Sequence, residues 1–483
     1  MRKILFLLIL ALLLSPVMVF AFDDETLEEE PSFVLNATAA ILVEQTTGRV
    51  LFGYNEHERR YPASMTKMLT ALVVLEHLSP DDIIVIGPEI QDMPSGYATP
   101  IHVEEEHLTV RMMLKALMIR SGNETGRALA LNVVRRVHNN PDISYEDAKP
   151  LFSNLMNEFA YELGATSSNF NNPYGLHSDQ HFTTAYDLAL IARAYMEVPL
   201  LAEIAGMHTF EGSGTEGRYI PDALIRDFEW TNTNLTLPEA NFGHPHMTGI
   251  KTGFTTPAGD CLAGAASFGD MAFITIVFDS ESPGRWQDTR RLMDYGFFNF
   301  SFREISQAGE LLEYARIVNP RRGETNVFAV HAMESYTTLI SHADYANMTR
   351  VITYNLMLTP PTRRQDDEDY EYYDDDRTRL QAPIQEGDFI GTVAYYVGDD
   401  LIFQSRLYAS ATVLERSFDS DMDYFISQFT DNMFTIRGLP YWLALGGTIL
   451  GLVGMGWALS LRRKVKEHER WHNPRPRGSS IGK

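Results

Sequence analysis

The hydrophobic pattern of residues 64–78 predicts a helix that is apolar on nearly every side. After Lys67 no charged side chain appears until Glu76, and Pro62 precedes the segment at a place where proline is tolerated. A helix without a polar face is covered by other elements all round, so it belongs inside a large domain. Its first turn is the exception, because Ser64 and Lys67 are three residues apart and lie on one face.

The patterns around this helix predict one large domain over residues 33–302. Alternating segments predict strands, and segments with a period near 3.6 predict helices. The predicted strands are residues 39–44, 49–55, 247–254, 261–268 and 271–279, and the predicted helices are residues 110–119, 124–137, 152–163, 184–196 and 290–300. A hairpin, a helical cluster and then strands predict an α+β fold, with an antiparallel sheet flanked by helices rather than a doubly wound parallel sheet.

In its second half the chain changes to short alternating strands separated by turns. The clearest are residues 327–330, 351–354 and 389–397, which predict a separate, smaller β-rich domain over residues 311–418. Its acidic loop, residues 365–377, holds eight carboxylates and three tyrosines. A solvated loop is the favoured interpretation, and a metal-binding loop is the alternative.

The first residues predict export. Arg2 and Lys3 precede an apolar core and a small-residue cleavage site, so residues 1–21 indicate a secretory signal peptide. A retained membrane anchor is the alternative interpretation. The acidic residues 22–32 that follow predict a solvated linker.

A second apolar segment predicts a transmembrane helix. Residues 438–461 hold no charged side chain, and this segment is long enough to span a bilayer. Trp442 and Trp457 lie toward its ends, as interfacial aromatic residues do. The tail that follows, residues 462–483, is basic. The positive-inside rule therefore predicts a single-pass protein of the cell membrane with a cytoplasmic C-terminus and an extracytoplasmic catalytic domain.

The composition argues against a nucleic-acid partner and excludes an intrachain disulfide. The chain has 483 residues, enough for two or three domains, and a formal net charge of −24. Its main body has no basic stripe, so no nucleic-acid partner is expected. The single cysteine, Cys261, allows no intrachain disulfide and lies among small apolar residues, which is typical of a buried structural position.

The hydroxyl of Ser64 and the amine of Lys67 have the parts of an activated nucleophile. A lysine can take the serine proton once its surroundings lower its pKa, and a helix N-terminus favours developing negative charge. A capped helix start is the alternative, because Ser-x-x-Lys arises by chance roughly once or twice in a chain of this length. The motif therefore needs support from elsewhere in the sequence.

Two further motifs give that support. A Ser-Gly-Asn motif at residues 121–123 connects two predicted buried helices, and a Lys-Thr-Gly motif at residues 251–253 lies on a predicted strand. Ser-x-x-Lys, Ser-Asp-Asn and Lys-Thr-Gly occur in this order in β-lactamases and penicillin-binding proteins. Each motif is weak alone, but all three in this order on the expected elements favour a catalytic site.

The chemistry of the set is coherent. Ser64 would attack a carbonyl, with unprotonated Lys67 as the general base. Lys251 and Ser121 would hold Lys67 neutral by surrounding it with positive charge and hydrogen bonds. Asn123 would bind the amide on the acyl side of the substrate and help to fix Lys67.

Substrate binding is assigned to the predicted strand at residues 247–254, which carries the Lys-Thr-Gly motif. Lys251 and the hydroxyl of Thr252 would bind a carboxylate, and Gly253 would let the substrate backbone lie alongside as an added strand. The backbone N–H groups of Ser64 and Phe254 would form an oxyanion hole. Side chains and backbone groups are sufficient for this chemistry, so no cofactor or metal ion is expected.

On these motifs the chain resembles the D-alanyl-D-alanine carboxypeptidases, the low-molecular-weight penicillin-binding proteins. The resemblance covers residues 39–300. Within this range it extends beyond the three motifs to Asn-Pro-Tyr-Gly-Leu at 172–176, Thr-Ala-Tyr-Asp at 184–187 and Tyr-Gly-Phe at 295–297. It implies a β-lactamase/transpeptidase-like domain and, for Arg285, a part in binding the terminal carboxylate of the substrate. Members of this family often carry a β-rich C-terminal domain and a membrane attachment.

The sequence departs from the family pattern at four places, and one of them is the acidic loop, which has no expected counterpart in the family. Thr248 stands where many members have an aspartate before the Lys-Thr-Gly strand, and Glu124 stands where an aspartate follows Ser-Gly-Asn. The C-terminal segment predicts a true membrane span, where many relatives use an amphipathic helix. None of these departures removes a predicted catalytic residue.

The resemblance implies an exported, membrane-tethered serine carboxypeptidase that removes the terminal D-alanine of peptidoglycan stem pentapeptides through an acyl-enzyme on Ser64. Its expected partners are the stem peptides, β-lactams as inhibitors and the membrane. One alternative is a serine β-lactamase, although no Glu-x-x-Leu-Asn sequence follows Asn123 to supply a water-activating glutamate. The other is a non-catalytic sensor or wall-binding protein that uses the β domain outside and the basic tail inside.

Overall fold

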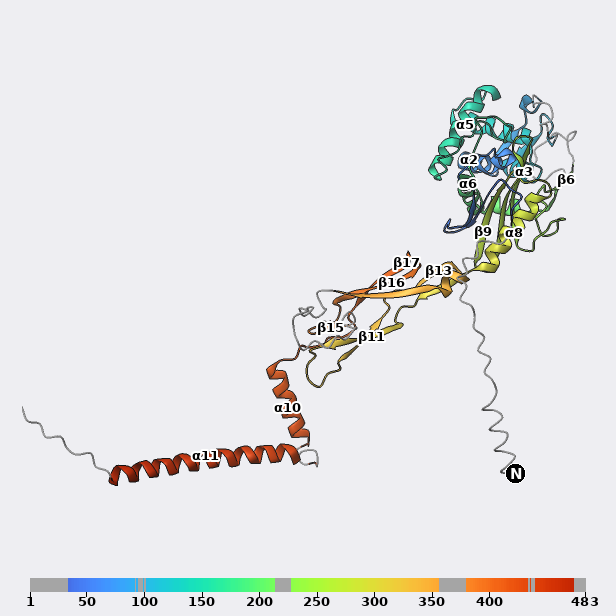
Figure 1. Ribbon diagram of the computed structural model, residues 1–483. Coiled ribbons are helices and arrows are strands. Elements are labelled where there is room, and N and C mark those ends of the chain that lie inside the picture. The colour runs from blue at the N-terminus through green and yellow to red at the C-terminus, as the bar shows by residue number, and fades with distance from the viewer. Residues whose placement is uncertain are drawn as a thin grey trace, which may run out of the picture. The chain divides into compact units, whose positions relative to one another are not determined.

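The computed structural model describes residues 34–91, 93, 99, 101–212, 227–355, 379–432, 435 and 439–472. These residues divide into two compact units, one within Met1–Phe302 and Leu339–Ala343 and the other within Arg303–Thr338 and Asp344–Lys483 (Figure 1). The predicted signal peptide, linker and acidic loop lie outside the described residues.

The first unit contains a five-stranded sheet in the order β2-β1-β9-β8-β7. Every neighbouring pair of its strands is antiparallel, which confirms the predicted sheet. The strands are β1 (Ala39–Glu44), β2 (Val50–Tyr54), β7 (Met247–Thr255), β8 (Gly259–Phe268) and β9 (Met271–Phe278). β7 is the last strand in this order, so one edge of its backbone is unpaired within the sheet.

Both faces of the sheet are buried. Successive side chains of a strand point to opposite faces, and in β1 the side chains of both faces belong to a hydrophobic core. Ile41 and Val43 of β1 belong to a large core that includes the helical cluster. Ala40 and Leu42 belong to a smaller core that includes Leu292 of α8 (Gly284–Asn299). The helical cluster therefore covers one face and α8 covers the other.

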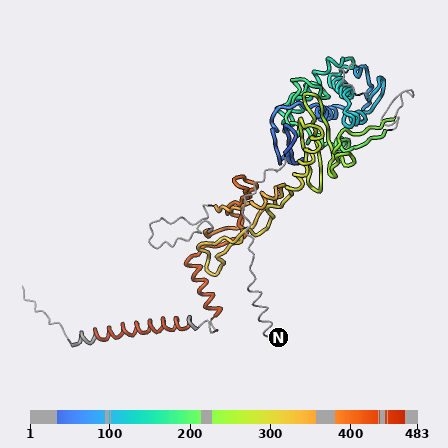
Figure 2. The backbone as a smooth tube through the Cα atoms, turned by 45° about the vertical axis from the view of Figure 1, so that its right-hand side comes forward, coloured from blue at the N-terminus to red at the C-terminus, as the bar shows by residue number. Residues whose placement is uncertain are grey.

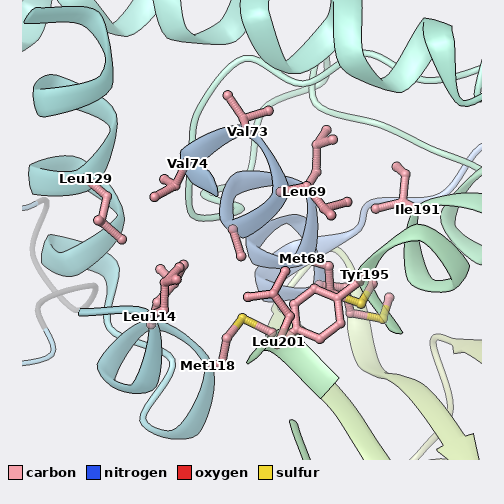
Figure 3. Packing of buried hydrophobic residues seen from close by; sticks show 14 of the residues in the cluster. Met68, Leu69, Val73, Val74, Leu114, Met118, Leu129, Ile191, Tyr195 and Leu201 are labelled. Carbon is pink, nitrogen blue, oxygen red and sulfur yellow. The ribbon is translucent and has the colours of Figure 1, made fainter. Parts of the chain in front are cut away.

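Six further helices form the cluster on the first face. They are α2 (Lys67–His77), α3 (Val110–Ile119), α4 (Asn123–Val137), α5 (Tyr145–Glu162), α6 (Ala185–Glu197) and α7 (Pro199–Gly206). Figure 3 shows α2 enclosed by its neighbours, with Met68, Leu69, Val73 and Val74 among Leu114 and Met118 of α3, Leu129 of α4, Ile191 and Tyr195 of α6 and Leu201 of α7. The prediction of a helix covered on all sides is confirmed.

Short elements complete the first unit. They are the 3-10 helices η1 (Ala63–Thr66) and η2 (Pro88–Ile90), the paired strands β3 (Ile83–Val85) and β4 (His107–Thr109), and the paired strands β5 (Thr209–Gly212) and β6 (Phe228–Thr231).

Three predicted helix starts were wrong. The segment that begins at Ser64 opens as a 3-10 turn, and the α-helix starts only at Lys67. α5 starts seven residues before the predicted position 152, because Ser144 caps it by accepting a hydrogen bond from the Asp147 N–H at 3.2 Å. α8 starts six residues before the predicted position 290.

The second unit is rich in short strands, as predicted. Figure 2 traces the backbone of this unit, which is coloured from yellow to red along the chain. Its sheets have the orders β12-β11-β15 and β14-β16-β17, whereas the paired strands β10 and β13 and the helix α9 each have residues in both units. The bounds are β10 (Phe300–Ser306), β11 (Leu311–Val318), β12 (Val327–His331), β13 (Tyr336–Ser341), α9 (His342–Ala346), β14 (Met348–Tyr354), β15 (Arg379–Gln381), β16 (Phe389–Val397) and β17 (Asp400–Tyr408).

Two helices follow these strands in the chain. The pattern did not predict α10 (Phe418–Asn432), whereas α11 (Leu439–His472) contains the predicted apolar segment. Within the described part of the chain, residues Trp442–Lys466 of α11 are long and apolar enough to cross a membrane. The predicted tail begins inside this helix, so its first residues continue α11.

Candidate active site

Ser64 lies on the 3-10 turn η1, directly before α2. Ala63 adopts a left-handed backbone with φ of 45°, which a non-glycine residue rarely adopts. No side chain caps η1, and the Ser64 Oγ instead lies 2.8 Å from the Lys67 Nζ. The hydroxyl therefore does not act as a helix cap, which was the alternative for this motif.

The Lys67 amine is fully buried among three oxygen atoms. Its Nζ lies 2.8 Å from the Ser64 Oγ, 2.7 Å from the Asn123 Oδ1 and 2.8 Å from the Tyr174 carbonyl oxygen. Burial holds the pKa of Lys67 well below its ordinary value, the nearby charge of Lys251 lowers it further, and Glu124 opposes the shift.

This geometry directs the lone pair of a neutral Lys67 amine toward the Ser64 hydroxyl. The Asn123 oxygen and the Tyr174 carbonyl only accept, so they take the two N–H bonds of the neutral amine. The lone pair that remains faces the Ser64 hydroxyl, which can donate to it. The arrangement is that of a serine hydroxyl hydrogen-bonded to a base.

The loop at residues 171–176 supplies the carbonyl of Tyr174. The Asn172 Oδ1 accepts from the N–H groups of Gly175 at 2.8 Å and Leu176 at 2.9 Å, which folds the loop into a tight turn. Gly175 has φ of 86°, and a Cβ there would lie 1.8 Å from the Ala63 carbonyl oxygen. Glycine at this position therefore lets the loop pack against η1.

His181 joins the same loop to η1. Its Nε2 lies 2.8 Å from the Thr66 Oγ1, and its Nδ1 accepts from the Asn171 N–H at 3.0 Å. Burial lowers the pKa of His181 to about 3, so the imidazole is neutral. With Nδ1 accepting, Nε2 carries the proton and donates to Thr66.

The Ser-Gly-Asn motif connects α3 and α4. Ser121 has a left-handed backbone with φ of 58°, and Gly122 has no room for a side chain because a Cβ would lie 2.3 Å from the Thr125 Oγ1. The turn brings Asn123 to the Lys67 amine. The hydroxyl of Ser121 is not one of the three oxygens that contact that amine.

The Lys-Thr-Gly motif runs along the edge strand β7. Lys251 is buried, and its Nζ donates to the Thr252 carbonyl at 3.1 Å and to the Thr252 Oγ1 at 3.3 Å. A Cβ on Gly253 would lie 3.3 Å from the Ala63 Cβ, so β7 passes directly beside η1. Phe254, the next residue, is 62% exposed.

Arg285 lies in the first turn of α8, beside β7. Its Nη1 donates to the Gly253 carbonyl at 3.2 Å and lies 2.8 Å from the Asp260 Oδ1, and its Cζ lies 4.3 Å from the Trp286 ring centre. Asp260 thus already neutralises part of the charge that was predicted to meet a substrate carboxylate. The role of Arg285 in binding substrate stays a prediction.

Sequence reasoning missed two groups at this site. The Tyr174 carbonyl is a backbone group, so no residue type marked it. Thr233 lies in the segment after β6, and its Oγ1 is 2.7 Å from the Thr252 Oγ1. A threonine in a polar loop carries no distinguishing signal in the sequence.

The sequence is similar to those of known carboxypeptidases. The sequence is 24% identical to D-alanyl-D-alanine carboxypeptidase DacF of Bacillus subtilis over 86% of this chain and 96% of the relative. It is 27% identical to DacD of Salmonella typhimurium over 86% of this chain and 95% of the relative.

Solved structures show the same fold. The D-alanyl-D-alanine carboxypeptidase DacD of Francisella tularensis matches with a TM-score of 0.58 and 21% identity over 79% of this chain and 95% of that one. Penicillin binding protein 5 of Haemophilus influenzae matches with a TM-score of 0.53 and 22% identity over 79% of this chain and 99% of that one.

The fold is therefore that of the penicillin-binding DD-peptidases. The chain belongs to the D-alanyl-D-alanine carboxypeptidase family, peptidase S11, whose pattern matches residues 24–282.

We expect Gly175→Ala to destabilise the protein more than Gly164→Ala. Both glycines have φ of 86°, but a Cβ at 164 would meet only the Leu190 Cδ1 at 3.7 Å. Gly164→Ala should lower the free energy of unfolding by about 1 kcal/mol through backbone strain alone, and Gly175→Ala by about 3 kcal/mol because it also displaces the Ala63 carbonyl. Urea unfolding measures both. Equal losses would contradict the packing described for this loop.

The stability of the protein should depend on pH through Lys251. Burial and the charge of Arg285 lower the pKa of Lys251 from 10.5 to about 7. Between these values the unfolded chain binds a proton that the folded chain does not, so the free energy of unfolding rises with pH. Lys251→Met should flatten that rise by up to about 1.4 kcal/mol per pH unit. Parallel urea-unfolding stabilities of the two proteins from pH 7 to 10 would contradict this expectation.

Proposed function

We propose that this chain is a serine-type carboxypeptidase that removes the terminal D-alanine of peptidoglycan stem pentapeptides. The observation that carries the proposal is the 2.8 Å contact between the Ser64 Oγ and the Lys67 Nζ. The family membership supports the substrate class. The proposed catalytic domain is residues 33–302, and residues 311–418 are proposed as a separate C-terminal β-rich domain.

In the proposed acylation step, the Ser64 Oγ attacks the carbonyl carbon of the penultimate D-alanine, and Lys67 takes the hydroxyl proton. The N–H groups of Ser64 and Phe254 stabilise the negative charge that develops on the carbonyl oxygen. The C–N bond then breaks, the proton passes to the leaving amine, and D-alanine departs. Water hydrolyses the ester and regenerates the hydroxyl of Ser64.

The remaining motif residues are proposed to bind and orient the substrate. The buried amine of Lys251, protonated when it binds the carboxylate, and the hydroxyl of Thr252 would hold the terminal carboxylate, with Arg285 contributing from the first turn of α8. The unpaired edge of β7 would accept the substrate backbone as an additional strand. Asn123 would bind the amide on the acyl side, and Ser121 is proposed to help in transferring the proton. A β-lactam would acylate the same serine, because its strained amide resembles the scissile bond.

Nothing in the described residues favours the β-lactamase alternative. That reaction needs a carboxylate that activates water for fast hydrolysis of the acyl-enzyme. Glu158 and Glu162, the candidates downstream of Asn123, are exposed on the surface of α5.

α11 is proposed as the single membrane anchor. Its apolar part precedes Arg462, Arg463 and Lys464, which favours a cytoplasmic C-terminus and an extracytoplasmic active site. This orientation agrees with the export signal that residues 1–21 predict and with a substrate that lies outside the membrane.

Ser64→Ala should abolish covalent labelling by a fluorescent penicillin and release of D-alanine from a defined pentapeptide. The reason is that the proposed acyl-enzyme forms on this oxygen. Gel fluorescence measures the adduct, and an amino-acid assay measures D-alanine. Exposed Ser167→Ala is the control and should behave as the wild type. Labelling that survives in Ser64→Ala would refute the assignment, and rapid turnover of penicillin by the wild type would favour the β-lactamase alternative.

A chain that ends after Asn432 should leave the membrane fraction and keep its penicillin labelling. It lacks α11 but retains the whole of the proposed catalytic domain. Fractionation of cells that express each form, followed by penicillin labelling, gives the distribution. If the shortened chain stays with the membrane, a part other than α11 holds it there, as the retained N-terminal anchor would.

A further inference from the structure

Glu124 is a buried carboxylate beside this site, and the proposed reaction gives it no task. It follows Asn123 in the first turn of α4, and only 3% of it is exposed. A buried carboxylate is unfavourable unless it is hydrogen-bonded, so its partners indicate why it is there.

The carboxylate binds two backbone N–H groups from one segment. Its Oε1 accepts from Ile101 at 2.9 Å, and its Oε2 accepts from Thr99 at 3.2 Å. The next residue of α4 contacts the same segment, because the Thr125 Oγ1 lies 2.8 Å from the His102 Nε2. Two consecutive side chains of α4 therefore hold Thr99, Ile101 and His102 against the start of this helix.

This packing encloses the turn that carries the Ser-Gly-Asn motif. A Cβ on Gly122 would lie 2.8 Å from the Ile101 Cδ1 and 2.3 Å from the Thr125 Oγ1. Ser121, with its left-handed backbone, is the residue before this glycine. A strained conformation persists only where neighbouring groups hold it, and the segment tied by Glu124 is one of those neighbours.

Glu124 also acts on the amine of Lys67 through its charge. The charged groups that influence this amine are Lys251 on β7 and Glu124 on α4, and its hydrogen-bond partners are uncharged. The negative charge raises the pKa of Lys67, against the lowering by burial and by Lys251. In the segment packed on α4, the buried titratable groups His102 and Glu106 lie 3.3 Å apart, and the His102 Nε2 contacts the Thr125 Oγ1, whereas Glu104 and Glu105 are exposed.

We propose that Glu124 is a positioning residue of this active site, which ties Thr99 and Ile101 to the Ser-Gly-Asn turn and opposes the positive charge of Lys251 at the Lys67 amine. The proposal rests on the proposed function, since it assigns a task at the same site. A carboxylate is required for the charge, and the length of a glutamate side chain is required to reach both N–H groups. The two requirements can be separated by substitution.

The test is the pH dependence of acylation of the full chain in detergent by a fluorescent penicillin. Glu124→Gln keeps the length and removes the charge, but its NH2 group cannot accept one of the two N–H bonds, so its plateau rate should fall as well. Only this variant should also move the acidic limb of the rate profile about one pH unit lower, as Lys67 loses its proton more easily. Glu124→Asp keeps the charge and shortens the side chain, so the limb should stay in place while the plateau rate falls about tenfold. Glu158→Gln removes an exposed carboxylate and should change neither.

A titration of the Lys67 side chain by 13C NMR, assigned by its loss in Lys67→Arg, measures the same shift without any substrate. If Glu124→Gln lowers the rate equally at every pH and leaves the Lys67 titration in place, Glu124 is only structural and the proposal is wrong. The proposal would also be wrong if Glu158→Gln shifted the acidic limb and the Lys67 titration as far as Glu124→Gln does. If the wild type is not acylated but the Lys67 shift is present, only the proposed function fails.

Discussion

The site depends on one buried amine and the three oxygen atoms that surround it. A lysine is rarely fully buried, because removing its charge from water is very unfavourable unless the group is paired or neutral. Here the amine has no carboxylate within hydrogen-bond distance among its described partners, and Lys251 lies near enough to lower its pKa. The neutral form is therefore favoured, and the neutral form is the one that can act as a base.

The rest of the first unit serves to place those oxygens. α2 is fixed by packing on all sides, which sets the position of Lys67 (Figure 3). The loop at residues 171–176 is folded by the side chain of Asn172, and α4 brings Asn123. Ala63 and Ser121, which both have a left-handed backbone, lie in the two turns beside Lys67. Gly175 packs closely against Ala63, and Gly122, the neighbour of Ser121, packs closely against Ile101 and Thr125, so a Cβ at either glycine would clash.

Much of the fold was predictable from the sequence, because it depends on local pattern. The order of a hairpin, a helical cluster and then strands predicted an antiparallel sheet flanked by helices, and the bounds of α3 were predicted without error. The start of α5 was missed, and Pro150 lies inside this helix, where proline is uncommon and the sequence pattern does not favour a helix. α10 was missed because its apolar positions alternate with many aspartates.

The contacts at the site were predictable only in part. Three motifs indicated which side chains would meet, and the structure brings Ser64, Lys67 and Asn123 into direct contact. The pairing of Arg285 with Asp260 was not predictable, because it depends on how closely α8 approaches the turn between β7 and β8. Backbone acceptors are absent from any pattern of side chains, and they become visible only with coordinates.

The separation in sequence of the groups around Lys67 has a consequence for biosynthesis. Its oxygen partners come from positions 3, 56 and 107 residues away, and β7 is added later still. A chain that is still incomplete holds Ser64 next to an ordinary protonated lysine, because the groups that dehydrate and orient the amine have not yet been added. The nucleophilic reactivity proposed for Ser64 therefore requires the closed domain, and in a nascent or misfolded chain this serine is an ordinary hydroxyl.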